Sequence, residues 1–417
     1  MSISKRIQNT KVSAIRKLTP FANEAKAKGI KVYHMNIGQP DIETPKEYFE
    51  ALKNYDKKVL GYENSEGINE LRIGFSDFLK IHDINYTPEE ILITNGGSEA
   101  LLFIFLTICD EGDEIIVPEP YYSNYNTIAN SCGVKLVPFQ TKIEDGFHIQ
   151  NKDSILKIIT EKTKAILYSN PSNPTGVVYS FNELQIIADV VYEKNLYVIS
   201  DEVYRELVYD NIEYKSIFSI EKVRDNLILV DSLSKRYSVC GSRIGMIASK
   251  NKDLMKEILK LCQARLSISS IEQYTATELL KLPMSYIHSV KDKYEERRNA
   301  ICNFLNEIPG VKSYKPEGAF YLIVSLPVDN AEDFCKWLLI DFNLNNETVM
   351  FAPAEGFYFD NELGKSQIRI SYCISVENIK KSMNILKEGL KVYNSIKKWG
   401  VNKYSSFLFK KFFYYKF

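Results

Sequence analysis

Short strand-like runs alternate with helix-like segments through the middle of this 417-residue chain. Such an alternation is typical of a mainly parallel sheet whose faces are covered by helices. The runs with the character of buried strands are Ile91–Thr94, Glu114–Val117, Lys135–Pro138, Lys164–Tyr168, Leu196–Ser200 and Asn226–Val230. Helical patterns lie between them: Ala100–Ile108 is apolar, and Phe181–Lys194 follows Ser180, which could cap it. The sequence therefore predicts an α/β fold.

The alternation of short apolar strands and helices ends near Lys291, where a charged helix is predicted over about Ser289–Ile308. Amphipathic strands follow at Ala319–Ser325, Thr348–Ala352 and Gln367–Cys373 and indicate a second, smaller α+β unit. A chain of this length exceeds what one hydrophobic core usually supports. The predicted organisation is an N-terminal segment 1–45 that joins the small domain, a large domain 46–290, a small domain 291–395, and a basic-aromatic tail 396–417. Within this tail, residues 404–417 show no clear periodicity, so they could be a frayed terminus or bind a membrane surface or a partner.

Composition narrows the class of partner. Lys+Arg and Asp+Glu both number 53, and a chain without net charge gives no reason to expect nucleic acid or an anionic membrane. The seven cysteines form no C-x-x-C pair, which argues against a disulfide framework or a zinc site. No run is long and apolar enough to span a membrane, and Met1–Thr10 does not resemble a secretory signal. We therefore expect a cytoplasmic protein that acts on small molecules without a metal.

Lys235 is the first candidate for chemistry, within a hydroxyl-rich segment after a predicted strand. A lysine amine forms an imine with an aldehyde and can then carry a proton. Ser232, Ser234 and Arg243 could donate hydrogen bonds to a phosphate, Arg243 as a charged fork. A solvated loop is the alternative for this segment alone.

Three further segments also follow predicted strands. Gly97 and Ser98 stand where a strand enters a helix, so their N–H groups could bind an anion. Asn173 lies between two Asn-Pro steps that favour a rigid extended turn. Asp201 ends another strand, and a carboxylate there could pair with a protonated pyridine nitrogen. Each segment alone has a structural alternative: a glycine turn, a loop or a helix cap.

Together the four segments resemble the class I, fold-type-I pyridoxal-phosphate-dependent aminotransferases of the aspartate aminotransferase superfamily, with the closest likeness to the bacterial Iβ branch. The resemblance runs from about Ser4 to Lys391 and includes the stretch 36–41 (Asn-Ile-Gly-Gln-Pro-Asp), Tyr62 with Gly67, and Arg369. It implies a large domain with a mainly parallel seven-stranded sheet and a smaller α+β domain built from both ends of the chain.

The resemblance also implies a role for each matching position around the cofactor. Lys235 would hold pyridoxal phosphate as an imine and move the substrate's Cα proton. Asp201 would keep the pyridine nitrogen protonated, while Asn173 and Tyr204 would bond the phenolic oxygen. Tyr122 stands where many relatives have a stacking tryptophan, and an aromatic face is retained.

The remaining roles concern the phosphate and the substrate. The phosphate would be held by Gly97, Ser98, Ser232 and Arg243. Tyr62 would reach the phosphate of the neighbouring subunit, which implies a homodimer with shared active sites. Arg369 would clamp the substrate's α-carboxylate, with the Gly38 backbone and Asn173 nearby.

The implied activity is ping-pong transamination between an L-amino acid and a 2-oxo acid, with glutamate and 2-oxoglutarate as one couple and aspartate or a neutral or aromatic amino acid as the other. Some relatives have lysine at the position of Ser98, and its absence weakens the case for aspartate. Arg16 or Lys17 could instead meet a distal carboxylate. A β-lyase or a cyclopropane-carboxylate synthase on the same fold is the alternative. We expect neither a DNA-binding regulator, since Asn36 already belongs to the shared motif, nor a scaffold without activity.

Overall fold

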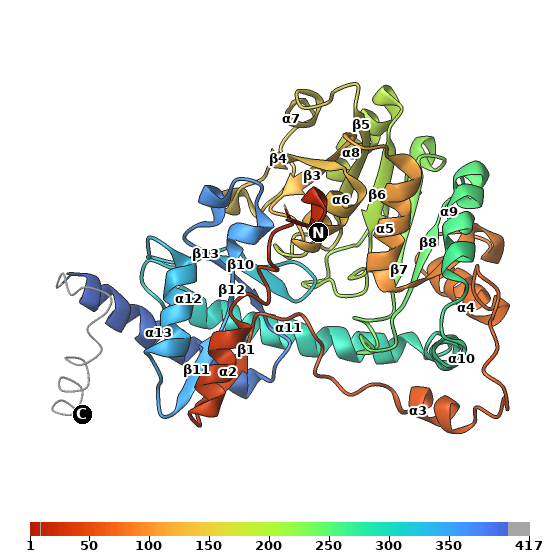
Figure 1. The fold of residues 1–417 in the computed structure, drawn as a ribbon. Coiled ribbons are helices and arrows are strands. Elements are labelled where there is room, and N and C mark those ends of the chain that lie inside the picture. Colours follow the sequence, from red (N-terminus) through yellow and green to blue (C-terminus); the bar gives the residue numbers. More distant parts are fainter. Residues whose placement is uncertain (9, 399–417) are drawn as a thin grey trace.

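A seven-stranded sheet dominates the computed structural model, which describes residues 1–8 and 10–398 (Figure 1). In spatial order the strands are β2 (Ile91–Asn95), β8 (Ile244–Ala248), β7 (Leu227–Ser232), β6 (Tyr197–Asp201), β5 (Thr163–Ser169), β3 (Glu114–Glu119) and β4 (Lys135–Gln140). Only β8 runs antiparallel to its neighbours in this sheet. The six predicted strands are confirmed, and β8 is an additional strand that the sequence did not predict.

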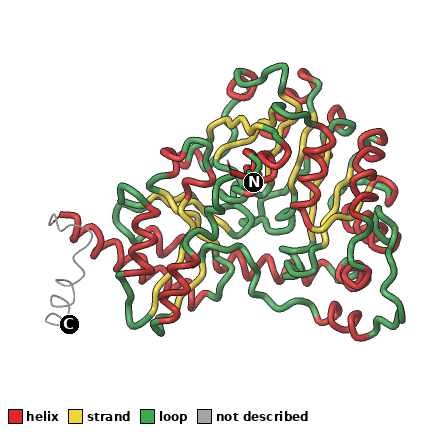
Figure 2. Tube along the Cα trace, in the orientation of Figure 1, coloured by secondary structure: helices red, strands yellow, loops and turns green. Residues whose placement is uncertain are grey.

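Helices cover both faces of this sheet (Figures 1 and 2). On one face lie α5 (Gly96–Ile108), α6 (Asn124–Cys132) and α9 (Lys252–Arg265); on the other lie α4 (Asn69–Lys80), α8 (Phe181–Lys194) and α10 (Ser270–Leu279). Alternate residues of a strand pack against opposite layers, as Val198 and Ile199 do. The predicted cap of α8 is confirmed, since the Ser180 hydroxyl and the Glu183 carboxylate each accept a backbone N–H from the other residue.

A second region contains smaller sheets. The antiparallel sheet has the order β12 (Ala352–Pro353), β13 (Gln367–Ser371), β10 (Tyr321–Ser325) and β9 (Lys312–Ser313), and β1 (Lys31–His34) pairs in parallel with β11 (Glu347–Met350). Their helices are α2 (Thr19–Ala27), α11 (Met284–Asn306), α12 (Ala331–Ile340) and α13 (Val376–Lys398). The predicted strand Thr348–Ala352 is divided between β11 and β12, and α11 begins at Met284 rather than at Ser289, after Pro283 in extended conformation.

Both the N-terminal and the C-terminal part of the described chain contribute to this second region, because β1 near the start pairs with β11 in the last quarter of the chain. The domain boundaries at residues 45, 290 and 395 stay predictions, and the tail 404–417 lies outside the described residues. Shorter helices are α1 (Lys5–Gln8), α3 (Lys46–Lys53) and α7 (Asp153–Leu156). No helix among residues 1–8 and 10–398 is long and apolar enough to cross a membrane.

The strand directions determine where polar residues gather. The parallel strands β2, β3, β5, β6 and β7 end at the same edge of the sheet, and ligands of open α/β sheets bind at this edge. The residues that follow these ends include the predicted site residues Ser98, Tyr122, Asn173, Tyr204 and Lys235.

Candidate active site

A cavity of about 190 Å³ lies at this edge of the sheet. Its wall includes every predicted site residue except Tyr62: Gly38, Gly97, Ser98, Tyr122, Asn173, Asp201, Tyr204, Ser232, Lys235, Arg243 and Arg369. They come from positions between 38 and 369, so the fold brings distant segments to one place.

The amine of Lys235 lies between two loops. Its Nζ donates to the Gly38 carbonyl oxygen at 3.0 Å and lies 3.6 Å from Cys240 Sγ. Gly38 needs to lack a side chain here, because a Cβ would lie 1.7 Å from the Tyr321 hydroxyl oxygen. Lys235 is half-buried, so its amine stays accessible from the cavity.

One end of the cavity is rich in hydrogen-bond donors. Helix α5 begins at Gly96, whose φ of 73° favours glycine, and a Cβ there would lie 2.3 Å from Arg243 Nη2. Arg243 donates to the carbonyl oxygen of Asn95, which places its guanidinium at the start of the helix. Gly97 and Ser98 line the cavity and lie in the first turn of α5, where backbone N–H groups have no partner within the helix.

The serines after β7 complete this end of the cavity. Ser232 Oγ lies 2.9 Å from Ser234 Oγ and donates to the Ile244 carbonyl oxygen, which fixes both hydroxyls. A helix N-terminus, a guanidinium and hydroxyl groups together form a site for an anion such as phosphate.

Asp201 supplies the carboxylate that lines the cavity. Tyr125 donates to Asp201 Oδ2 at 2.8 Å. Burial raises the pKa of Asp201 to about 6, although the bonds from Tyr125 and from the Val203 N–H oppose this. A carboxylate in this environment can accept a hydrogen bond from a protonated heterocyclic nitrogen.

Arg369 is fully buried, in strand β13. Its guanidinium donates to Asn173 Oδ1 at 3.0 Å and to the Asn36 carbonyl oxygen, and it lies over the Tyr321 ring with 4.5 Å to the centroid. Burial lowers the pKa of Arg369. No carboxylate of the described residues lies within ion-pair distance of it, so this cation lacks a counter-charge that an acidic ligand can provide.

The sequence alone did not single out Tyr125 or Tyr321. The Tyr321 hydroxyl lies 2.9 Å from that of Tyr204 and thereby links the ring-binding side of the cavity to Arg369. Both missed tyrosines lie among 27 tyrosines in the chain, and no local signal distinguishes them.

Tyr62 takes no part in the cavity of its own chain, and its side chain is 81% exposed. The role predicted for Tyr62 concerns a neighbouring subunit, so it stays a prediction.

The residues of the cavity fit pyridoxal phosphate. The donor-rich end suits the phosphate, Asp201 suits the ring nitrogen, and the Lys235 amine can bind the aldehyde carbon. The absence of side chains at Gly96 and Gly97 leaves the start of α5 open to an anion.

Comparisons with known proteins agree with this chemistry. A family model described as aminotransferase class I and II matches residues 30–386. The chain is 33% identical over 394 residues to a probable aspartate/prephenate aminotransferase of Aquifex aeolicus, with 93% of this chain and 98% of that protein covered. It is also 33% identical over 392 residues to a (5-formylfuran-3-yl)methyl phosphate transaminase of Methanocaldococcus jannaschii, with 93% and 99% covered.

Solved structures give the same result. An alanine aminotransferase from Pyrococcus furiosus superposes with a TM-score of 0.86 at 33% identity, and the match covers 94% of this chain and 100% of that one. The likeness confirms the predicted α/β fold with its mainly parallel seven-stranded sheet. The names of these relatives state different substrates.

Proposed function

Because the chain belongs to the class I and II aminotransferase family, whose members depend on pyridoxal phosphate, we propose that it moves an amino group between an L-amino acid and a 2-oxo acid by a ping-pong mechanism. The observation that supports this proposal best is the buried Arg369, which has no acidic partner among the described residues and lines the same cavity as Lys235 and Asp201. A β-lyase is not favoured, because the relatives are named as aminotransferases or transaminases.

The polar and aromatic residues predicted for the site each have a task in this proposal. When bound, the cofactor supplies an electron-withdrawing ring that makes the substrate's Cα–H acidic. Lys235 Nζ would take up that proton from Cα, and in the other half of the cycle it would deliver a proton to the Cα of the second substrate. Asp201 accepts a hydrogen bond from the ring nitrogen, while Arg369 and Asn173 orient the substrate's α-carboxylate. The Tyr122 ring lines the cavity and offers a stacking face.

We also propose a homodimer with shared active sites and a cytoplasmic location. Exposed apolar side chains gather beside Tyr62, where Val59 is 77% and Leu60 is 63% exposed. A group of exposed apolar residues is typical of an interaction surface, and a second copy would bring Tyr62 to the partner's phosphate end. The seven cysteines are free, which is consistent with a reducing compartment.

The substrate couple depends on which cations near the cavity are already paired. Lys17 Nζ binds Glu332 and lies 3.8 Å from Glu355. Arg16 lines the cavity and makes no ion pair with another described residue. The Ile15 carbonyl oxygen accepts a hydrogen bond from Asn36 Nδ2 at 2.7 Å, which holds the backbone beside Arg16 in place.

The charge of the cavity favours an acidic substrate. Four cationic side chains line it, against the one carboxylate of Asp201: Arg16, Lys235, Arg243 and Arg369. Arg243 is assigned to the phosphate and Arg369 to the α-carboxylate, so Arg16 is available for a second carboxylate. We therefore propose glutamate and 2-oxoglutarate as one couple, with aspartate or a neutral or aromatic amino acid as the other.

A panel of amino donors, each added alone to the cofactor-loaded protein and followed by 2-oxoglutarate, tests the proposed activity. We expect conversion of the bound cofactor to its amine form with glutamate and at least one further donor, measured by the change in absorbance. If no donor in the panel changes the absorbance of the loaded protein, transamination is contradicted.

Exchange of Arg16 for glutamine tests the proposed couple. We expect Arg16→Gln to lower kcat/KM for glutamate by about 10- to 100-fold, since a hydrogen bond to a charged group contributes about 1.5–3 kcal/mol. The matched control is Lys17→Gln, which removes the neighbouring cation that already has acidic partners. Equal losses for glutamate and alanine in Arg16→Gln would contradict a contact with the distal carboxylate.

A further inference from the structure

A cluster of buried charges lies near the same edge of the sheet, outside the wall of the cavity. We call Glu202, Arg205, Glu206, Asp231 and Arg236 the buried ion cluster. All five side chains are at most 2% exposed. None of them lines the cavity, and none has a part in the proposed mechanism.

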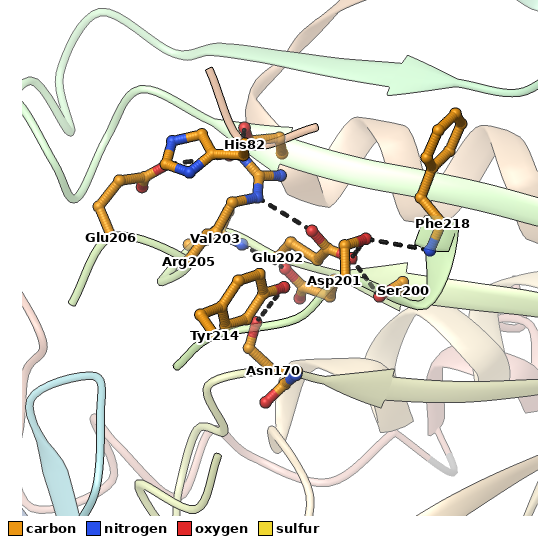
Figure 3. A network of polar contacts seen from close by, with 12 residues as sticks. His82, Asn170, Ser200, Asp201, Glu202, Val203, Arg205, Glu206, Tyr214 and Phe218 are labelled. Atoms are coloured by element: carbon orange, nitrogen blue, oxygen red, sulfur yellow. Dashed lines mark hydrogen bonds and ion pairs between the residues drawn. The ribbon is translucent and has the colours of Figure 1, made fainter. Parts of the chain in front are cut away.

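Its ion pairs connect strands β6 and β7. Arg205 Nε donates to Glu202 at 3.0 Å, and its Nη1 donates to Asp231 at 3.1 Å. Arg236 binds the other oxygen of Asp231 and reaches Glu206 with its Nε at 3.1 Å. Figure 3 shows Arg205 and Glu202 directed toward one another, with Glu206 and His82 beside the guanidinium. Each carboxylate therefore contacts at least one guanidinium.

The cluster alternates with the cofactor residues along the chain. Asp201 precedes Glu202, Tyr204 precedes Arg205, Asp231 precedes Ser232, and Lys235 precedes Arg236. In β6 and β7 this follows from the alternation of side chains between the two faces of a strand. Asp201 and Ser232 lie on the same strand faces as Ile199 and Val230, two residues earlier, which pack in the core layer of α5, α6 and α9. Glu202 and Asp231 fall on the opposite faces, which they share with residues such as Val198 and Leu229 of the other core layer.

Stability alone gives no strong reason for such a cluster, because buried ion pairs often contribute little after the cost of removing charges from water. Its hydrogen bonds instead hold the segments that follow β6 and β7, where the cofactor residues lie. Ser216 and Ser200 donate to Glu202 Oε1 at 2.6 and 2.9 Å, and the Ser232 N–H donates to Asp231 Oδ1 at 2.6 Å. A shift of the cluster would therefore move the chain that carries Asp201 and Ser232.

The cluster also acts on Asp201 through its charge. The carboxylates of Asp231 and Glu202 are among the causes that raise the pKa of Asp201, after its burial. Burial and the two guanidiniums lower the pKa of His82 to about 3, so His82 adds no positive charge. The cluster thus contains three carboxylates and two guanidiniums close to Asp201, the residue proposed to bind the ring nitrogen.

We propose that the buried ion cluster consists of positioning residues that hold Asp201 and Lys235 in place and, through the carboxylates of Glu202 and Asp231, favour a proton on the nitrogen of the cofactor ring. The proposal rests on the proposed function, in which Asp201 binds that nitrogen. Removal of a carboxylate and removal of a guanidinium should therefore shift the proton affinity of the ring nitrogen in opposite directions.

The test uses the holoenzyme with cofactor labelled with nitrogen-15 in the ring, and measures the pH midpoint at which its resonance changes. We expect Glu202→Gln to lower this midpoint by about one pH unit, the size of an ordinary environmental shift, and Arg236→Gln to raise it. Glu206→Gln removes a carboxylate at the edge of the cluster and should lower the midpoint if Glu202→Gln does not fold.

Glu183→Gln is the matched control. Glu183 is also a buried carboxylate, which accepts hydrogen bonds from Ser180 and Ile149 away from the cavity. We expect this variant to melt at a lower temperature with an unchanged nitrogen midpoint. Midpoints that stay constant, or that move in the same direction in both cluster variants, would overturn the proposal. The proposed function fails separately, if the unaltered protein shows no lysine-bound cofactor.

Discussion

Replacement of Lys235 by alanine is expected to lower turnover by about 10⁴-fold and to remove the absorbance of the lysine-bound cofactor. No other lysine lines the cavity in the described part of the chain, so no second amine can take the aldehyde or move the Cα proton. The neighbours of Lys235 Nζ are the Gly38 carbonyl oxygen and Cys240 Sγ, which cannot replace a mobile base at the substrate. Stopped assays with a radiolabelled amino acid and an absorbance spectrum of the loaded protein measure both effects.

Two controls separate the loss of the amine from a loss of structure. Lys17→Ala removes a cation whose partners are Glu332 and Glu355 and should retain turnover. A small added amine should restore part of the activity of Lys235→Ala, because it can enter the space that the side chain leaves. Near-normal transamination by Lys235→Ala without added amine would contradict the assignment of the lysine.

Replacement of Arg369 by glutamine should lower kcat/KM by about 10²- to 10³-fold for every amino donor, because loss of one partner of a buried charge pair costs about 2–5 kcal/mol. The buried guanidinium lies over the Tyr321 ring and donates to Asn173, and these contacts fix the plane that we propose meets the α-carboxylate. Because all substrates share that carboxylate, the loss should not depend on the side chain of the donor. Steady-state kinetics with glutamate and alanine measure this.

Arg298 provides a matched control for Arg369. It is equally buried and lies over the Tyr209 ring at 5.0 Å, but it already pairs with Asp210 at 2.7 and 2.9 Å. Arg298→Gln should therefore destabilise the protein and leave KM for the amino donor almost unchanged. If both variants raise KM equally, the effect of Arg369 is structural and the carboxylate clamp is wrong.

Local signals explain the parts of the fold that the sequence predicted. The cap of α8 depends on Ser180 and Glu183, three residues apart, and both bonds form within one turn. The strands of the parallel sheet are continuous apolar runs because both of their faces are buried. Strand β8 was missed because its place depends on pairing with β2 and β7, whose positions the local pattern does not contain.

In the site, too, features that depend on neighbouring residues could be predicted, and features that depend on distant residues could not. Lys235, Asp201, Asn173 and Arg369 could be predicted because each lies in a stretch with a recognisable pattern of neighbours, and the structure places all four at one cavity. The choice between Arg16 and Lys17 could not be made from sequence. The carboxylates that pair with Lys17 belong to Glu332 and Glu355, which lie more than 300 residues away in the sequence.

The hydroxyl of Tyr321 occupies the space that a Cβ at residue 38 would need, while its ring supports Arg369 and its oxygen touches Tyr204. Residues 38 and 321 therefore cannot vary independently in evolution or in design. A larger residue at 38 becomes possible only together with a smaller one at 321, and that exchange would remove the support of Arg369, the arginine proposed to bind the substrate. An engineer who wishes to widen the cavity will find less constraint at Ser98, whose side chain is exposed.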